Sequence, residues 1–101
     1  MRTLLLTALT IGLLGTAAPA FAAGDPAAGK DKASACAMCH GPNGEGTSMA
    51  PKLTGMNQAA FVQAMDDYKS GKKDNAMMKS QAASLSDADI ANLAAYYATL
   101  K

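Results

Sequence analysis

Residues 36–40 read Cys36-Ala37-Met38-Cys39-His40, and the rest of the chain is organised around this stretch. The pattern C-x-x-C-H is typical of covalent haem attachment. In that chemistry the two thiols add across the two vinyl groups of the haem and become thioethers. A separation of three residues puts both sulfurs on one side of a single helical turn. The imidazole of His40 is then held under the iron, where its Nε2 becomes an axial ligand.

Other uses of this pair of cysteines are less favoured. A structural zinc ion needs four ligands, and the chain has two cysteines and one histidine. A redox dithiol of the thioredoxin kind needs neighbouring strands, and no segment alternates like a strand. A disulfide between Cys36 and Cys39 would close a very small loop and would constrain little of the unfolded chain. The sequence therefore favours haem attachment.

The first 22 residues have the pattern of a secretory signal peptide. Arg2 supplies the positive start, an apolar run through Leu14 follows, and Ala20-Phe21-Ala22 offers small residues for cleavage. The apolar run is short for a membrane span. We therefore expect residues 1–22 to be removed and residues 23–101 to form the domain, without a membrane span after cleavage. This predicts a periplasmic or otherwise exported protein, and haem attachment of this kind also occurs outside the cytoplasm.

Charge and size narrow the class of the domain. Without Arg2 the lysines and the acidic side chains are equal in number, so no basic surplus indicates a nucleic-acid binder. The domain is small, lacks tryptophan and is rich in alanine and methionine. A core of that kind needs additional support. We expect the haem to form much of the core and the apoprotein to fold poorly.

Capping residues and apolar spacing predict three main helices. Asp25-Pro26 is a good helix start, and the first helix should run from there into the Cys36 turn. Asn57 is a good cap for a second helix over about 58–70, which Gly71 ends.

The third helix begins at Ser86, with Asp89 as the partner in a shortened capping box, and its apolar face continues to the end of the chain. Residues 41–56 are rich in turn formers, and residues 72–78 show no periodicity, so both segments are predicted as loops. The predicted fold class is all-α, with three main helices and long loops wrapped around one covalently attached haem.

The second axial position of the iron needs a ligand from another part of the chain. Methionine is a soft, neutral ligand that favours ferrous iron and raises the reduction potential. Met65 lies on a predicted helix face and is more simply a core residue. Met77 and Met78 follow an intervening helix, which gives the chain enough length to reach the opposite haem face. The pattern favours this pair and does not choose between its members.

The sequence resembles the class I bacterial cytochromes c, in particular the small soluble monohaem proteins and the half-domains of the dihaem ones. The resemblance covers nearly all of residues 24–101 and is specific as a set, whereas C-x-x-C-H alone would not fix the class. The matching residues are Gly29, Cys36 to Gly41, Gly44, Gly46, Pro51 to Gly55, Tyr68 to Lys72, Met77 to Ile90 and Leu93 to Tyr97.

This resemblance implies roles for single residues. In relatives the ligand methionine stands eight residues before the serine of the Leu-Ser-Asp segment, which here implies Met78, with Met77 as the fallback. Pro51 matches the proline whose carbonyl accepts a hydrogen bond from the second ring nitrogen of the histidine. Gly29 matches the glycine at the crossing of the first and last helices, against which Tyr96 packs.

The expected function is that of an exported one-electron carrier, because a haem with two protein ligands has no open coordination site. No catalytic residue is nominated, and the chain is expected not to be an enzyme. The donor and acceptor proteins are not identified by the sequence. A positive rim could steer an acidic partner, and it would consist of Lys69, Lys72, Lys73 and Lys79.

Two alternatives stay open. The chain could be the haem c subunit of a periplasmic dehydrogenase or oxidase complex. It could also be a ligand-binding haem protein, if Met78 detaches from the iron.

Overall fold

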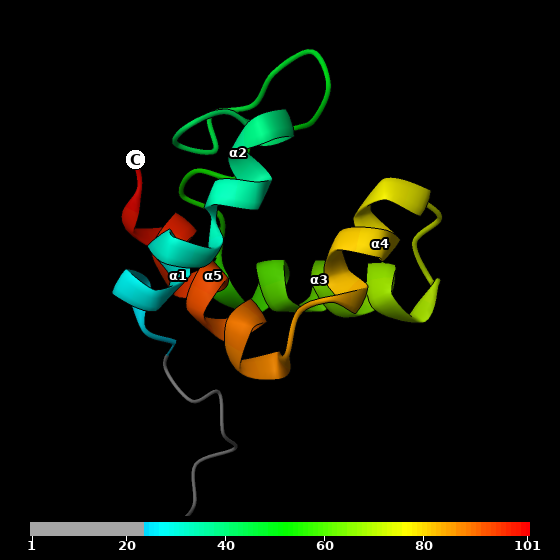
Figure 1. The fold of residues 1–101 in the computed structure, drawn as a ribbon. Coiled ribbons are helices and arrows are strands. Elements are labelled where there is room, and N and C mark those ends of the chain that lie inside the picture. Colours follow the sequence, from blue (N-terminus) through cyan, green and yellow to red (C-terminus); the bar gives the residue numbers. More distant parts are fainter. Residues whose placement is uncertain (1–23) are drawn as a thin grey trace, which may run out of the picture.

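The computed structural model describes residues 24–101, and the predicted signal peptide lies outside them. Five helices follow one another along the chain, and residues 24–101 contain no strand, so the all-α class is confirmed (Figure 1). The helices are α1 (Pro26–Lys32), α2 (Ser34–His40), α3 (Gln58–Ser70), α4 (Ala76–Ala83) and α5 (Asp87–Thr99). No helix in this part of the chain is long and apolar enough to cross a membrane.

The first and last helices cross at Gly29. Helix α1 packs along α5, and Gly29 is buried where the two helices meet. A Cβ atom at this position would lie 2.8 Å from Cβ of Tyr96 and closer still to the backbone carbonyl of Asn92. Only a residue without a side chain allows this approach. The predicted crossing of Gly29 and Tyr96 is confirmed.

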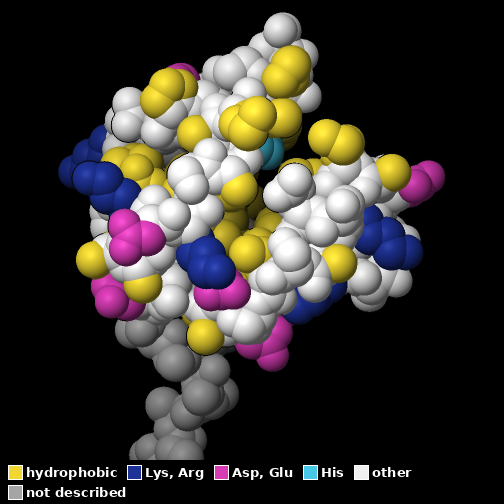
Figure 2. Space-filling model, viewed as in Figure 1, with side chains coloured by type: hydrophobic (Ala, Val, Ile, Leu, Met, Phe, Trp, Pro, Cys, Tyr) yellow, Lys and Arg dark blue, Asp and Glu magenta, His cyan; other side chains and the backbone are white. Residues whose placement is uncertain are grey.

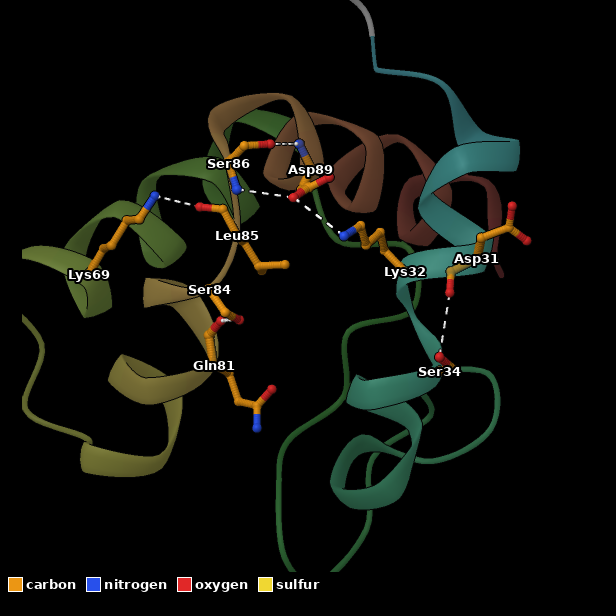
Figure 3. Close-up of polar contacts among 9 residues, drawn as sticks. All are labelled: Asp31, Lys32, Ser34, Lys69, Gln81, Ser84, Leu85, Ser86 and Asp89. Atoms are coloured by element: carbon orange, nitrogen blue, oxygen red, sulfur yellow. Dashed lines mark hydrogen bonds and ion pairs between the residues drawn. The ribbon is translucent and has the colours of Figure 1, made fainter.

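The predicted first helix is in fact two short helices joined at Ala33. Ala33 ends α1 and precedes α2, and its side chain is buried. The Oγ atom of Ser34 donates to the carbonyl oxygen of Asp31 at 3.4 Å (Figure 3). Hydroxyl groups that bond back to the preceding turn in this way often bend helices. The bend lets α1 pack on α5 while α2 turns away from it (Figure 1).

Helix α3 has the predicted limits. The side chain of Asn57 accepts from the backbone N–H of Ala60, and Gly71 ends the helix in the left-handed region with φ of 83°. Phe61 and Met65 are buried, and the ring of Phe61 lies 5.8 Å from that of Tyr97 on α5. Met65 is thus a core residue, as the sequence predicts.

Residues 76–78 were predicted as loop, and this prediction is wrong: they form the first turn of α4. The side chain of Asn75 accepts from the backbone N–H of Met78 at 3.0 Å and caps the helix. The helix has no apolar stripe, because Ala82 is its only buried residue. A helix without such a stripe leaves no periodic signal in the sequence.

Helix α5 begins with the predicted capping box. The backbone N–H of Ser86 donates to the Asp89 carboxylate, and the backbone N–H of Asp89 donates to Oγ of Ser86, both at 3.0 Å (Figure 3). The Ser86 N–H lowers the pKa of Asp89. Ile90, Leu93, Ala94 and Tyr97 are buried, so α5 forms the centre of the core.

Candidate functional site

Helices α2 and α4 stand on opposite sides of a hollow. Helix α2 has its backbone contacts with α1, and α4 has its backbone contacts with α3, while Cys36 of α2 and Met78 of α4 each pack against the core. Figure 2 shows the space between them as a depression bordered by hydrophobic side chains, with the histidine at its edge. The protein therefore offers two walls around an apolar space, and these walls do not pack on each other within residues 24–101.

Helix α2 carries the two cysteines into this region. Cys36 and Cys39 are half-buried free thiols, one helical turn apart. Cys36 packs against the core beside Tyr97. Burial raises the pKa of the Cys36 thiol. The pKa of Tyr97 is also raised, mainly by burial and to a smaller extent by the neighbouring Cys36 thiol. Both thiols are thus held on one face of α2, on the side where a porphyrin edge would have to meet them.

His40 ends α2 and is held by a backbone acceptor. Its side chain is buried, with 6% of its surface exposed. The Nδ1 atom lies 2.6 Å from the carbonyl oxygen of Pro51. With Nδ1–H donating to this carbonyl, Nε2 carries a free lone pair, and no group among residues 24–101 hydrogen-bonds to it. An imidazole held in this way is ready to bind a metal through Nε2.

The loop 41–56 is tied back to the end of α2 and thereby places Pro51. The backbone N–H of Gly46 donates to the carbonyl oxygen of His40 at 2.7 Å. The backbone N–H of Leu53 donates to the carbonyl oxygen of Gly44 at 2.7 Å. Gly44 has a φ of 69°, and a Cβ atom there would collide with the Tyr97 ring. The loop is therefore a fixed part of the wall, closed against α5.

The two candidate methionines of α4 differ in burial. Met78 is half-buried and packs against the core, whereas Met77 is 66% exposed. Met78 and the buried Ala82 are four residues apart and lie on one face of the helix. The structure thus separates two residues that the sequence pattern alone could not separate.

The predicted lysine rim is only partly free. Lys69 is half-buried, and its Nζ donates to the carbonyl oxygen of Leu85 at 2.6 Å (Figure 3). Lys73 lies over the ring of Tyr68, with 5.5 Å from Nζ to the ring centroid. Lys72, Lys73 and Lys79 are exposed. The contact of Lys69 joins residues 16 positions apart, and nothing in the sequence pattern indicated it.

The donor set fits a haem and does not fit the alternatives. Two thiols and one imidazole lie on the α2 side, a half-buried thioether lies on α4, and apolar side chains border the hollow (Figure 2). Within residues 24–101, no three His, Cys, Asp or Glu side chains gather as a zinc site would require. Haem needs this combination of thiols, axial donors and apolar walls.

A shallow depression of about 460 Å³ lies elsewhere, at the start of α3 and the end of α5. Its lining contains no thiol or imidazole, so it does not compete as the site. It is lined by Gly55, Met56, Asn57, Gln58, Ala59 and Ala98.

Comparison with known proteins agrees with this geometry. The family described as "Cytochrome c" matches residues 26–101. Cytochrome c4 of Pseudomonas aeruginosa is 43% identical over 94 residues, which cover 92% of this chain and 45% of that relative. Cytochrome c-554(548) of Halomonas halodenitrificans is 41% identical, covering 76% of this chain and 98% of that relative.

A solved structure shares the fold. The reduced recombinant cytochrome c4 from Pseudomonas stutzeri superposes with a TM-score of 0.66 at 30% identity, covering 77% of this chain and 50% of that one. The chain thus spans about half the length of the cytochrome c4 relatives that it matches. Together with the C-x-x-C-H motif on α2, these matches establish that the chain belongs to the cytochrome c family and that its cofactor is a covalently attached haem c.

Proposed function

We propose that this chain is an exported carrier of single electrons, in which His40 and Met78 bind the haem iron from opposite sides. The observation that carries the proposal is that the two helices bordering the apolar hollow, α2 and α4, each carry one side chain able to bind iron (Figure 2). Nε2 of His40 is left free on the α2 side, and Met78 is half-buried on the α4 side. With both axial positions filled by the protein, small molecules have no open site on the iron.

The haem supplies a reversible one-electron change at its iron, and the chain's residues set the conditions for that change. Cys36 and Cys39 hold the group covalently on α2. Pro51 accepts from Nδ1–H of His40 and fixes the imidazole, which would leave Nε2 available to bind the iron. Met78 is neutral and soft, so it stabilises the reduced state and raises the potential. This division of roles needs no acid, base or nucleophile, and we assign no enzymatic activity to the chain.

Visible spectra of the purified haem-loaded protein test this proposal. We expect low-spin bands on reduction, a weak far-red sulfur-to-iron band in the oxidised form, and no change when carbon monoxide is added to the reduced form. Redox titration should follow a single one-electron curve. A high-spin spectrum or a carbon monoxide adduct would overturn the carrier assignment in favour of ligand binding.

We also propose that an acidic redox partner docks on the lysines near α4. Lys72, Lys73 and Lys79 are exposed near the Met78 helix and would attract such a partner. Lys69 is left out of this rim, because its amine is bonded to Leu85. The second-order rate with a negatively charged redox protein should fall as ionic strength rises, and should fall less after Lys72, Lys73 and Lys79 are all changed to Gln. A rate independent of salt would exclude steering.

Export is supported by the pattern of residues 1–22 and by the chemistry of haem attachment. Cell fractionation tests it: the haem-loaded protein should be released with the periplasmic fraction, and its N-terminus should begin near Ala23. Recovery in the cytoplasmic fraction with residues 1–22 intact would contradict it.

One observation favours a second candidate, an electron-transfer subunit of a larger complex. Three methionines are largely exposed: Met38 at 82%, Met49 at 68% and Met77 at 66%. In a contiguous apolar patch, side chains of this kind mark a surface that a partner covers. Gel filtration of the protein from its native host separates the two candidates. A carrier should elute as the small free domain, and a subunit should elute with its enzyme.

A further inference from the structure

We propose that Lys69 is a positioning residue for Met78. Its bond to the carbonyl oxygen of Leu85 fixes the end of α4 and thereby the direction in which Met78 faces the hollow. The inference rests on the proposed ligation of iron by Met78. It assigns to Lys69 a role inside the protein in place of the docking role that the sequence suggested.

Packing alone holds α4 weakly. Ala82 is the only buried residue among the eight of this helix, and α3 is the only described helix on which α4 packs. By comparison, α5 buries five side chains. A helix that buries so little apolar surface can roll or swing at small cost in free energy. Its orientation must therefore come from contacts at its ends.

Two polar contacts hold α4, one near each of its ends. At the start, the Asn75 side chain accepts from the backbone N–H of Met78. Just past the last residue of α4, the half-buried amine of Lys69 donates to Leu85 at 2.6 Å (Figure 3). A cation beside the carbonyl end of a helix is favourable, because the unpaired carbonyls there carry partial negative charge. Lys69 therefore links α3 to the connection between α4 and α5.

The link acts on Met78 because Met78 and Ala82 share one face of α4. Met78 packs against the core on the Ala82 side of the helix and Met77 is exposed to solvent. With both ends of α4 fixed, this face is held in one direction, and we infer that it turns Met78 toward the hollow. Without the Lys69 contact, the C-terminal end of α4 is released and the shared face can turn away. A ligand on a less restrained helix is displaced more readily by a competing ligand.

Displacement of the methionine by imidazole measures this effect. The far-red sulfur-to-iron band of the oxidised protein is followed as imidazole is added to the wild type and to Lys69→Met. We expect half-displacement of the band at about fivefold lower imidazole concentration in Lys69→Met, the loss expected for the net contribution of one ordinary hydrogen bond. Lys69→Gln, with a side chain one bond shorter, is the milder second variant and should shift the concentration in the same direction.

Two controls remove a lysine without touching α4. Lys32→Met breaks the 3.6 Å ion pair with Asp89 at the start of α5, on the other side of the same junction (Figure 3). Lys72→Met removes an exposed charge next to α3. In both control variants, imidazole should displace the methionine at the same concentration as in the wild type. Their melting temperatures, measured alongside, report any general loss of stability.

The outcomes separate this inference from the proposed function. If the wild type shows no sulfur-to-iron band, the ligation by Met78 itself fails, and with it the inference. Suppose that the wild type shows the band and that imidazole displaces the methionine of both Lys69 variants at the wild-type concentration. The positioning role of Lys69 is then wrong, while the ligation by Met78 stands. An equally large fall in the displacing imidazole concentration for Lys32→Met would also overturn the positioning role, because the effect would then be general destabilisation.

Discussion

The two walls of the haem site are built in different ways. On the α2 side, His40 is buried, its ring is bonded to Pro51, and two half-buried cysteines stand in the preceding turn of the same helix. On the α4 side, Met78 sits on a helix with a single buried residue, Asn75 caps the start of that helix, and Lys69 bonds to Leu85 just past its end. One wall is fixed by the core and by the covalent attachment, and the other by a few polar contacts.

This difference indicates which properties each wall controls. Damage to the α2 wall removes the cofactor, and with it much of the core. If Met78 binds the iron as proposed, damage to the α4 wall should leave the cofactor attached and change what binds the iron. The reduction potential and the access of ligands should therefore be adjustable through α4 without loss of the fold.

The largest effect is expected on the α2 side, from the double variant Cys36→Ala/Cys39→Ala. Without the thiols no covalent bond to haem can form, and the apolar hollow remains unfilled. We expect no haem on the denatured protein and no cooperative thermal transition by circular dichroism. A double variant that melts cooperatively without haem would show that the apoprotein core suffices.

The counterpart on the α4 side is Met78→Ala, with Met77→Ala as its matched control. Met78→Ala should keep its covalent haem, become high-spin, bind carbon monoxide when reduced, and show a lower potential, because the soft neutral ligand is gone. Met77→Ala should keep the wild-type spectrum, since Met77 is exposed. The reverse result, with only Met77→Ala altered, would move the assignment to Met77.

A variant at the crossing of α1 and α5 tests the packing that supports both walls. Gly29→Ala should destabilise the protein by about 3 kcal/mol, because the added methyl group collides with backbone and Cβ atoms of α5 that cannot move aside. Denaturant titration of the haem-loaded protein measures this value. A loss below about 1 kcal/mol would mean that α1 and α5 separate more easily than their packing indicates.

The smallest predicted effects compare two helix caps. Asn75→Ala and Ser86→Ala each remove one capping bond and should each cost about 1 kcal/mol in stability. Only Asn75→Ala should also lower the imidazole concentration that displaces the sulfur-to-iron band, because Asn75 bonds directly to the backbone of Met78. Equal displacement in both variants would show that the caps act only through overall stability.

The same contrast separates what the sequence could predict from what it could not. Helices α3 and α5 follow from cap residues and apolar spacing, because both bury a stripe of side chains against the core. Helix α4 buries only Ala82 and leaves no such spacing, although Asn75 was an available cap signal. The bend at Ala33 depends on how α1 meets α5, a contact between distant parts of the chain.

The site shows a similar division. Cys36, Cys39 and His40 stand in one local motif, so their grouping was readable from the sequence. Met77 and Met78 are adjacent, and the residue pattern alone does not choose between them. The family resemblance implies Met78, and the rotation of α4 in the folded chain buries Met78 more than Met77. The bond between Lys69 and Leu85 joins α3 to the connection between α4 and α5 and has no local signature.

X-ray absorption at the iron edge of the oxidised, haem-loaded protein tests the central claim most directly. It identifies the atoms bound to iron without reference to any partner. We expect one sulfur ligand besides the porphyrin and imidazole nitrogens in the wild type, and loss of that sulfur in Met78→Ala. A wild type with nitrogen or oxygen in place of sulfur, or a sulfur that persists in Met78→Ala, would contradict it.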